Sequence, residues 1–286
     1  MEPQSTAERR RTGDSPVNPP RITIACVVGH VTGSTAALLA ALPDWATLVR
    51  APNPGPMTLD GTNTWVLRAP GSLSCVVVDP GPLDEGHLAA VGDLGPITAI
   101  LLTHNHEDHS EGVPRLSELT GAPVNPPAPD TDLLIETLVT PGHTADSLSF
   151  VVSLPDGSQR AVLTGDTVLG RGTTVVAYPD GDLGDYLASL RVLAAFPPGT
   201  PALPGHGPAL DDVAAAATYY LHHREQRLDQ VRAALAAGDE TAEQVVARVY
   251  ADVDHGLWWA AELSVRAQLD YLRRESQPPT AELDEP

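Results

Sequence analysis

The residues best suited to chemistry in this sequence lie in one short segment, which reads T-H-N-H-E-D-H over residues 103–109. His104 and His106 follow an apolar run that we expect to form a buried strand. Because alternate residues of an extended chain project to the same side, both imidazoles can converge on one point. Asp108 and His109 come one step further along and can face a second point. Imidazole and carboxylate groups suit zinc, so this segment predicts the beginning of two adjacent metal sites.

Three further candidate ligands each follow an apolar run and stand beside glycine. His143 lies in P-G-H-T after the strand predicted over residues 134–140, and Asp166 lies in T-G-D-T after the strand predicted over 161–164. His206 lies in P-G-H-G, again after a short apolar run. Glycine lets the backbone turn sharply and approach its neighbours closely. Active sites of layered α/β folds gather at strand ends, so we expect these side chains to complete the two metal sites.

The rest of the chain alternates between strand-like and helix-like patterns. Apolar or alternating runs predict strands over residues 62–68, 74–79, 97–103, 134–140, 147–154 and 161–164, with 175–178 as a further candidate. Helical patterns cover residues 83–94, 113–120, 183–195, 210–237, 241–250 and 257–274. The polar segment 104–112 and the proline-rich segment 123–130 are expected to be loops.

This order of elements predicts three parts of the chain. Residues 1–44 are expected to form a disordered tail, polar and proline-rich over residues 1–20, followed by an N-terminal extension. Residues 45–225 mix strands and helices and are expected to form an α/β catalytic domain. Residues 226–286 contain only helical patterns and a frayed end, so we expect a small C-terminal helical module there.

The charge balance argues against a nucleic-acid partner. The sequence has 37 acidic residues against 17 basic ones, for a formal net charge of −20. Neutralisation of phosphates by basic side chains supplies most non-specific affinity for nucleic acids, so RNA and DNA are disfavoured. Every basic residue is arginine. The absence of lysine excludes a P-loop ATPase and an enzyme that forms a Schiff base.

The two cysteines, Cys26 and Cys75, form no CxxC pair and no disulfide framework. A reduced, cytoplasmic setting therefore fits best. Residues 22–42 are mildly apolar but carry polar residues near their middle, which disfavours a membrane span. The arginines at positions 9–11 stand too far upstream for a signal peptide. We expect no membrane association.

The order of the candidate ligands resembles the metallo-β-lactamase superfamily. It reads HxHxDH, then a single His, a single Asp and a Gly-His pair. Further segments are similar to the β-lactamase-like protein 2 branch of that superfamily. They are N-P-G-P-M-T-L-D-G-T-N-T-W over 53–65, V-D-P-G over 78–81, G-H-G-P over 205–208 and H-H-R-E-Q over 222–226. The resemblance covers roughly residues 50–275.

The resemblance implies an αββα sandwich with the site at one edge and a small winged-helix-like C-terminal module. It assigns His104, His106 and His143 to one metal, Asp108, His109 and His206 to the other, and Asp166 to a bridge between them. Two Zn²⁺ ions per chain are expected, with Mn²⁺ or Fe²⁺ as alternatives. Aspartate at the bridging position is typical of glyoxalase II-like and RNase-like branches. True β-lactamases usually carry cysteine there, so hydrolysis of antibiotics is not expected.

The activity expected from this site is hydrolysis of an ester, a thioester or a related acyl bond in a small molecule. Water acidified by the metals would attack the carbonyl, and Asp108 and Asp166 would position it or handle its proton. The alternative is a metal-dependent endoribonuclease acting on single-stranded RNA, which the charge balance disfavours. A redox role is a third possibility, but the sequence shows neither a fused flavin domain nor a glutamate among the ligands. The oligomeric state is left open.

Several residues outside the ligand set could have either a structural or a functional role. Asp79 ends a valine-rich strand and is expected to orient the segment 104–109. Arg171 could bind an anionic substrate group or could be a solvated loop residue. His223 and Arg224 fit a surface helix face better than the cleft. The stretch between His109 and His143 is short for this branch, which would leave one side of the cleft open.

Overall fold

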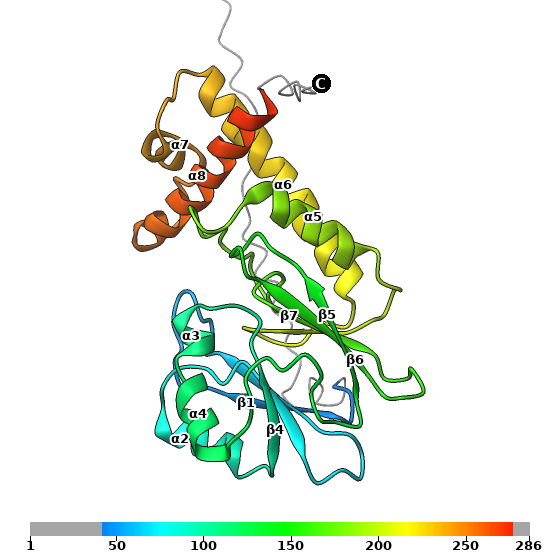
Figure 1. Cartoon of the computed structure of the whole chain (residues 1–286). Coiled ribbons are helices and arrows are strands. Elements are labelled where there is room, and N and C mark those ends of the chain that lie inside the picture. Colours follow the sequence, from blue (N-terminus) through cyan, green and yellow to red (C-terminus); the bar gives the residue numbers. More distant parts are fainter. Residues whose placement is uncertain (1–41, 277–286) are drawn as a thin grey trace, which may run out of the picture. The chain divides into compact units, whose positions relative to one another are not determined.

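The computed structural model describes residues 42–276, which form two four-stranded sheets and the helices that cover them (Figure 1). Residues 1–41 and 277–286 lie outside the described residues. Most of the predicted N-terminal extension, including Cys26, is therefore not part of this description. None of the helices in residues 42–276 is both long enough and apolar enough to cross a membrane.

The first sheet contains the strands β1 to β4 in chain order. Their bounds are β1 Ala46–Arg50, β2 Asn63–Leu67, β3 Cys75–Val78 and β4 Ile97–Leu101. The pairs β1–β2 and β2–β3 are antiparallel, whereas β3 and β4 are parallel. Helix α2 (Glu85–Gly92) makes the crossover that a parallel pair requires.

The second sheet repeats this topology. Its strands are β5 Leu134–Val139, β6 Leu148–Ser153, β7 Ala161–Gly165 and β8 Ala202–Pro204. The pairs β5–β6 and β6–β7 are antiparallel, and β7 and β8 are parallel. Helix α5 (Leu183–Ala194) lies in the crossover between β7 and β8. The sequence showed no internal repeat, so this likeness between the two sheets is visible only in the structure.

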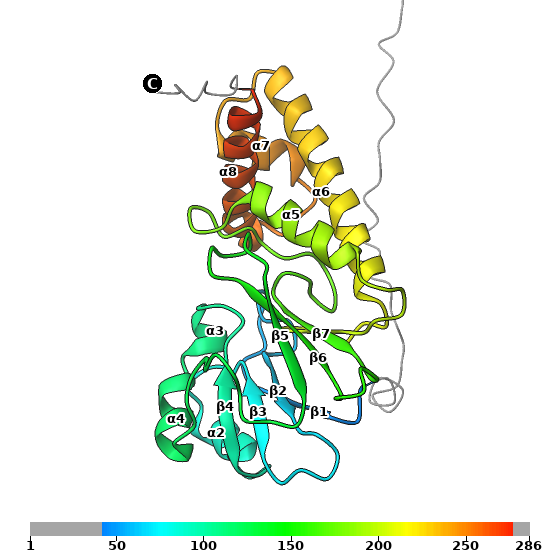
Figure 2. The same cartoon turned by 45° about the vertical axis from the view of Figure 1, so that its right-hand side comes forward.

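Alternating side chains place each sheet between two hydrophobic layers. Val76 and Val78 of the first sheet pack with Phe150 and Val152 of the second in a shared core between the sheets. Val77, between the first two valines, faces the opposite way, toward helices α2 and α4 (Val113–Thr120). Because successive side chains of a strand point to opposite faces, strands buried on both faces are apolar throughout. These layers form the predicted αββα sandwich (Figure 2).

The C-terminal helices lie on the outer side of the second sheet, where the first of them runs beside α5 and the other two pack against this pair (Figures 1 and 2). They are α6 Val213–Ala236, α7 Ala242–Val249 and α8 Trp258–Glu275. They share one buried cluster with α5 and with Val151 and Val162 of the sheet. Helix α6 is continuous across position 225, where we expected the catalytic domain to end. The boundary between the two parts thus stays a prediction.

Three local expectations differ from the structure. Strand β1 was not predicted, because Ala46–Arg50 alternates only weakly between buried and exposed residues. Residues 175–178 do not form a strand. Within the segment 104–112, Glu107–Ser110 forms the short helix α3 instead of a loop. The other predicted helices and strands are present, with ends that differ from the prediction by no more than three residues.

Candidate metal centre

All seven candidate ligands lie in segments that follow strands, two of them, Asp108 and His109, on the short helix α3. Four of them, His104, His106, Asp108 and His109, come from the segment after β4. The other three each follow a different strand of the second sheet. They are His143 after β5, Asp166 directly after β7 and His206 after β8.

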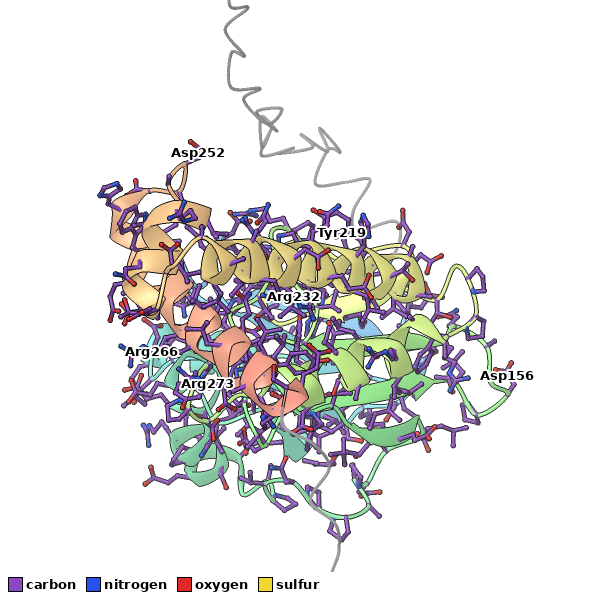
Figure 3. The ribbon with its side chains drawn as sticks, turned by 90° about the horizontal axis from the view of Figure 1, so that it is seen from above. Asp156, Tyr219, Arg232, Asp252, Arg266 and Arg273 are labelled. Atoms are coloured by element: carbon purple, nitrogen blue, oxygen red, sulfur yellow. The ribbon has the colours of Figure 1, made fainter. Side chains whose placement is uncertain are left out.

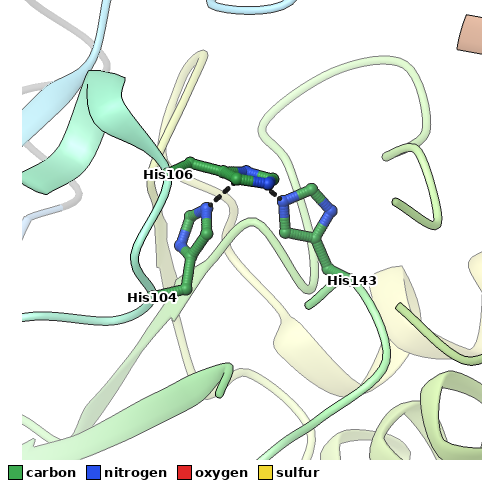
Figure 4. Close-up of side chains that lie close together, drawn as sticks. All are labelled: His104, His106 and His143. Atoms are coloured by element: carbon green, nitrogen blue, oxygen red, sulfur yellow. Dashed lines mark hydrogen bonds between the residues drawn. The ribbon is translucent and has the colours of Figure 1, made fainter. Parts of the chain in front are cut away.

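A first cluster contains His104, His106 and His143, whose rings point toward one another (Figure 4). The His104 Nε2 and the His143 Nε2 each lie 3.1 Å from the Nδ1 of His106. Two nitrogens bound to one tetrahedral zinc ion at about 2.0–2.1 Å lie roughly 3.3–3.4 Å apart. The three nitrogens therefore have the spacing of ligands to a single ion.

A second cluster contains Asp108, His109 and His206. The His206 Nε2 lies 3.1 Å from the His109 Nε2 and 3.1 Å from the Asp108 Oδ2. The loop that carries His206 is fixed by Asn63 of β2, whose side-chain amide donates to the carbonyls of Pro204 and Gly207. One residue of the first sheet thus determines where the last ligand of the second sheet lies.

Asp166 lies between the two clusters. Its Oδ1 lies 3.5 Å from the His109 Nε2, and its Oδ2 lies 3.4 Å from the His206 Nε2 and 3.9 Å from the His143 Nε2. The carboxylate is buried, and its Oδ1 has no hydrogen-bond partner among the described residues. Gly205 makes this approach possible, because a Cβ at that position would lie 2.5 Å from the same oxygen.

In His143, His109 and His206, the hydrogen bond at Nδ1 determines which ring nitrogen carries the proton and which can bind a metal. His143 Nδ1 faces the Val175 carbonyl at 2.6 Å, and His109 Nδ1 faces the Asp79 Oδ2 at 2.9 Å. His206 Nδ1 faces the Gly61 carbonyl at 3.4 Å. A carbonyl or carboxylate oxygen only accepts, so each Nδ1 must carry the proton and each neutral ring turns a lone pair inward.

This arrangement fits a pair of divalent metal ions. The lone pairs of His109 and His206 face each other at 3.1 Å, which is unfavourable unless a cation or a proton lies between them. The unpartnered oxygen of Asp166 is a second unsatisfied acceptor at the same place. Imidazole rings whose other nitrogen is bonded to a carboxylate or a carbonyl are the usual ligands of zinc-type metals. Both the spacing of these side chains and their chemistry therefore fit zinc-type metal ions.

The electrostatics of the two clusters differ. Burial and the neighbouring His109 hold the pKa of His104 well below its ordinary value. Burial would also lower the pKa of His206, but Asp166 and Asp108 outweigh it and raise the pKa to about 9. Burial would raise the pKa of Asp166, but His206 and His109 hold it well below the ordinary range. Asp108 and the neighbouring Asp166 thus give the second cluster the stronger attraction for a cation.

Asp79 orients the segment after β4, as the sequence predicted. Its buried carboxylate accepts from the backbone N–H of Thr103 at 2.8 Å, from the Thr103 hydroxyl at 2.7 Å and from His109 Nδ1 at 2.9 Å. The three bonds fix the start of the segment and the ring of His109 together. Asp79 itself has a φ of 53°, a left-handed conformation that aspartate and asparagine tolerate better than most residues.

His143 is held from the opposite side by residues 174–177. Thr174 Oγ1 lies 3.2 Å from the His143 Nδ1, next to the bond with Val175. The Thr174 carbonyl in turn accepts from the Arg224 guanidinium on helix α6. Arg224 is only 3% exposed and packs over the ring of Tyr186, at 5.1 Å from the ring centroid. The expectation of a surface position for Arg224 is therefore wrong.

A cavity of about 330 Å³ opens beside His143 and Asp166. Arg171 lies at its wall, but its guanidinium forms a two-pronged ion pair with Asp60, with one contact of 2.8 Å. Arg171 therefore has an acidic partner of its own. The cavity is also lined by four residues of the C-terminal region that the sequence analysis did not assign to the cleft, namely His223, Arg224, Arg227 and Tyr250.

One signal in the sequence pointed to these residues. His223, Arg224 and Arg227 share one face of α6 by their spacing, and no acidic residue lies three or four positions from either arginine. In a chain with so many acidic residues, arginines without helical partners are candidates for another role.

Comparison with known proteins identifies the family. Residues 57–137 match the metallo-beta-lactamase superfamily, and residues 241–277 match the beta-lactamase associated winged helix domain. The chain is 30% identical over 264 residues to the beta-lactamase-like protein 2 homolog of Caenorhabditis elegans, covering 82% of this chain and 86% of the relative. The homolog of Drosophila melanogaster is 31% identical over 264 residues, covering 79% and 86%. This chain belongs to the metallo-β-lactamase superfamily.

Solved structures of the superfamily share its fold. A beta-lactamase domain protein from Burkholderia ambifaria superposes with a TM-score of 0.67 at 21% identity, covering 81% of this chain and 86% of the other. A metallo-beta-lactamase family protein from Thermus thermophilus superposes with a TM-score of 0.60 at 24% identity, covering 81% and 94%. The chain is a metal-dependent hydrolase of this superfamily, and its clusters of His and Asp side chains could hold a metal.

Proposed function

We propose that this protein binds two zinc-type ions and hydrolyses an ester, a thioester or a related acyl bond in a small molecule, as in the glyoxalase II-like branch. The observation that carries the proposal is the position of Asp166. Its two oxygens lie within 4 Å of imidazole nitrogens from both clusters, and one of them has no protein partner. His104, His106 and His143 would hold one ion, Asp108, His109 and His206 the other, and Asp166 would join them.

When bound, the two ions supply acidified water and polarisation of the carbonyl oxygen. The side chain of Asp108 is 29% exposed, whereas His109 and His206 are fully buried. Asp108 is thus the donor in the second cluster that solvent and substrate can reach, and it is the group best placed to take a proton from water. Hydrolysis forms one C–O bond to water oxygen, breaks the C–O or C–S bond of the substrate and returns a proton to the leaving alcohol or thiol.

The cavity supports an acyl substrate over a nucleic acid. Its volume of about 330 Å³ lies within the range of small-molecule pockets, and apolar residues form much of its wall. The chain around it is strongly acidic, with a formal net charge of −20. An extended RNA strand needs a basic groove along its backbone, and this balance of charge disfavours one.

The first experiment is metal analysis of the purified protein. We expect up to two zinc-class ions per chain by elemental analysis, or the same uptake after addition of Zn²⁺ or Mn²⁺ to chelator-treated protein. No uptake at all would rule out the metal site.

The second experiment compares initial rates on a panel of thioesters, lactones and single-stranded RNA, with Asp166→Ala as the control on every substrate. Thioester or lactone turnover that the control lacks supports the proposal. Metal-dependent RNA cleavage that exceeds the best acyl turnover, and that is lost in the control, would establish an endoribonuclease instead.

A further inference from the structure

The cavity beside the metal centre has two kinds of wall. At one end it reaches His143 and Asp166. The helical side is formed by apolar residues near the start of α8, namely Val253, Leu257, Ala260 and Ala261, together with His223, Arg224 and Arg227 of α6. Among the described residues, Asp166 is the only acidic one that lines this cavity. A cavity with a cationic wall is unusual in a protein with more than twice as many acidic as basic residues.

The two arginines on the helical side of this wall have no acidic partners within residues 42–276. Within residues 42–276, seven arginines lie within 4.0 Å of a carboxylate, among them Arg171 at the cavity wall and Arg232 on the outer part of α6 (Figure 3). Neither Arg224 nor Arg227 has such a contact with any described residue. Since an arginine stays charged in any protein setting, its positive charge here is left for another group to balance.

Part of the hydrogen-bonding capacity of this wall is also unused. The Nε of Arg224 and the Nδ1 of His223 are buried without a partner among the described residues. Arg227 donates through Nη1 alone, to the Gln230 side chain at 2.9 Å and to the Val249 carbonyl at 3.3 Å, while its guanidinium lies 4.5 Å from the Tyr250 ring centroid. These contacts hold the planar group in place and leave other N–H groups free to bind a ligand.

We propose that Arg227, with Arg224 and His223, binds an anionic group carried by the acyl substrate. A carboxylate or a phosphate offers paired oxygens that match the guanidinium fork. The apolar residues near the start of α8 would contact the carbon chain between this group and the scissile carbonyl. The inference rests on the proposed function, because it places the reacting carbonyl at the metal centre and the anionic end at α6.

The test uses thioesters of N-acetylcysteamine that differ only in the far end of the acyl chain. The glutaryl thioester ends in a carboxylate, its monomethyl ester is neutral, and a phosphono analogue of the same length ends in a phosphonate. The shared leaving group, N-acetylcysteamine, carries no charge. A difference in KM between these substrates therefore comes from the far end of the acyl chain. We expect a lower KM for one or both anionic substrates than for the neutral one.

Arg227→Gln should raise the KM for the preferred anionic substrate roughly 10- to 100-fold, with kcat little changed, because a hydrogen bond to a charged group is lost. The KM for the neutral ester should stay the same. Arg227→Lys should retain part of the preference. Arg232→Gln removes an arginine of the same helix that already pairs with Asp229 and Glu275, and it should change nothing. Thermal unfolding of each variant separates loss of binding from loss of fold.

Calorimetric titration of the intact protein with glutarate and with glutaramide provides a readout that does not depend on turnover. Binding of glutarate that Arg227→Gln weakens, together with no hydrolysis of any thioester, would support the anion site and refute the proposed activity. Equal KM values for charged and neutral substrates, or an Arg227→Gln effect of the same size on both, would overturn the inference. An Arg227→Gln effect confined to single-stranded RNA would overturn it as well.

Discussion

The two sheets have the same strand order, yet they contribute to the candidate metal centre in different ways. The first sheet supplies four candidate ligands from one segment after β4. The second supplies three, one after each of β5, β7 and β8. A contiguous segment brings its side chains together through local backbone geometry. Dispersed ligands meet only when the sheet that carries them is assembled.

The groups that orient these ligands differ in the same way. On the first sheet, the orienting carboxylate of Asp79 comes from the end of the neighbouring strand β3. On the second, the loop that orients His143 is held by Arg224 from helix α6, far along the chain. The first half of the site is therefore oriented from within its own sheet. The second half depends on the C-terminal helices for His143 and on Asn63 of the first sheet for His206.

Loss of the residue that belongs to both halves should have the largest effect. Asp166→Ala removes the carboxylate between the clusters, so we expect turnover to fall by about 1000-fold or more, with the fold retained. Circular dichroism and steady-state rates measure the two effects separately. Wild-type rates in this variant on every active substrate would mean that the site is assigned wrongly.

Loss of Asp79 tests the half of the site that the first sheet supplies. Asparagine tolerates the left-handed backbone there, but its NH₂ group must face the Thr103 N–H or the donors at the other oxygen. We expect Asp79→Asn to weaken metal affinity roughly 10- to 100-fold, measured by competition with a chromogenic chelator. Asp84→Asn is the matched control, since Asp84 caps α2 and asparagine caps equally well. Unchanged affinity would show that Asp79 is only a packing residue.

Loss of Arg224 tests the half that depends on the helices. Arg224→Gln withdraws the donor to the Thr174 carbonyl, so the loop that fixes the His143 ring should relax. We expect one metal per chain to bind about 10-fold more weakly while the second is unaffected, with partial rescue by Arg224→Lys. The same chelator titration resolves the two ions. Equal weakening of both, together with a lower Tm, would indicate a general structural role instead.

The smallest expected effect concerns the docking of α8 on α5. Asp182 caps α5 and pairs with Arg274 of α8. Burial opposes ionisation, but the Asp185 N–H and Arg274 hold the pKa of Asp182 below its ordinary value of 3.8. Asp182→Asn keeps the cap and removes the ion pair, so we expect a loss of about 0.5–1 kcal/mol, because the pair is partly exposed.

The pH dependence of this loss follows from the direction of the shift. A lowered pKa in the folded state stabilises the protein above the ordinary pKa and loses that effect as the pH falls through the lowered value. The difference in unfolding free energy between Asp182→Asn and the wild type should therefore be present at pH 7 and shrink below pH 3.8. Denaturant melts at both pH values check it. A difference that grew on acidification would contradict the ion pair.

Much of the site could be predicted because its chemistry is encoded locally. The segment 103–109 places four candidate ligands within a few residues of one strand, and a glycine marks each of the other three. Asp79 could be predicted from its place at a strand end. The contact of Arg224 with the loop beside His143 could not, because a helical pattern shows which residues share a face but not what that face packs against. The ion pair of Arg171 could not be predicted either, because its partner Asp60 lies in a loop distant in the sequence.

The sequence by itself determined the donor types, their order along the chain and the strands that precede them, since these depend on residue identity and short-range periodicity. Only the tertiary structure decided which side chains meet. Gly205 contacts the Asp166 carboxylate because β7 and β8 are parallel neighbours, and Arg224 reaches the loop beside His143 because α6 packs across the second sheet. Both contacts join residues distant in sequence, and they form only when burial of the shared cores outweighs the entropy of closing the intervening loops.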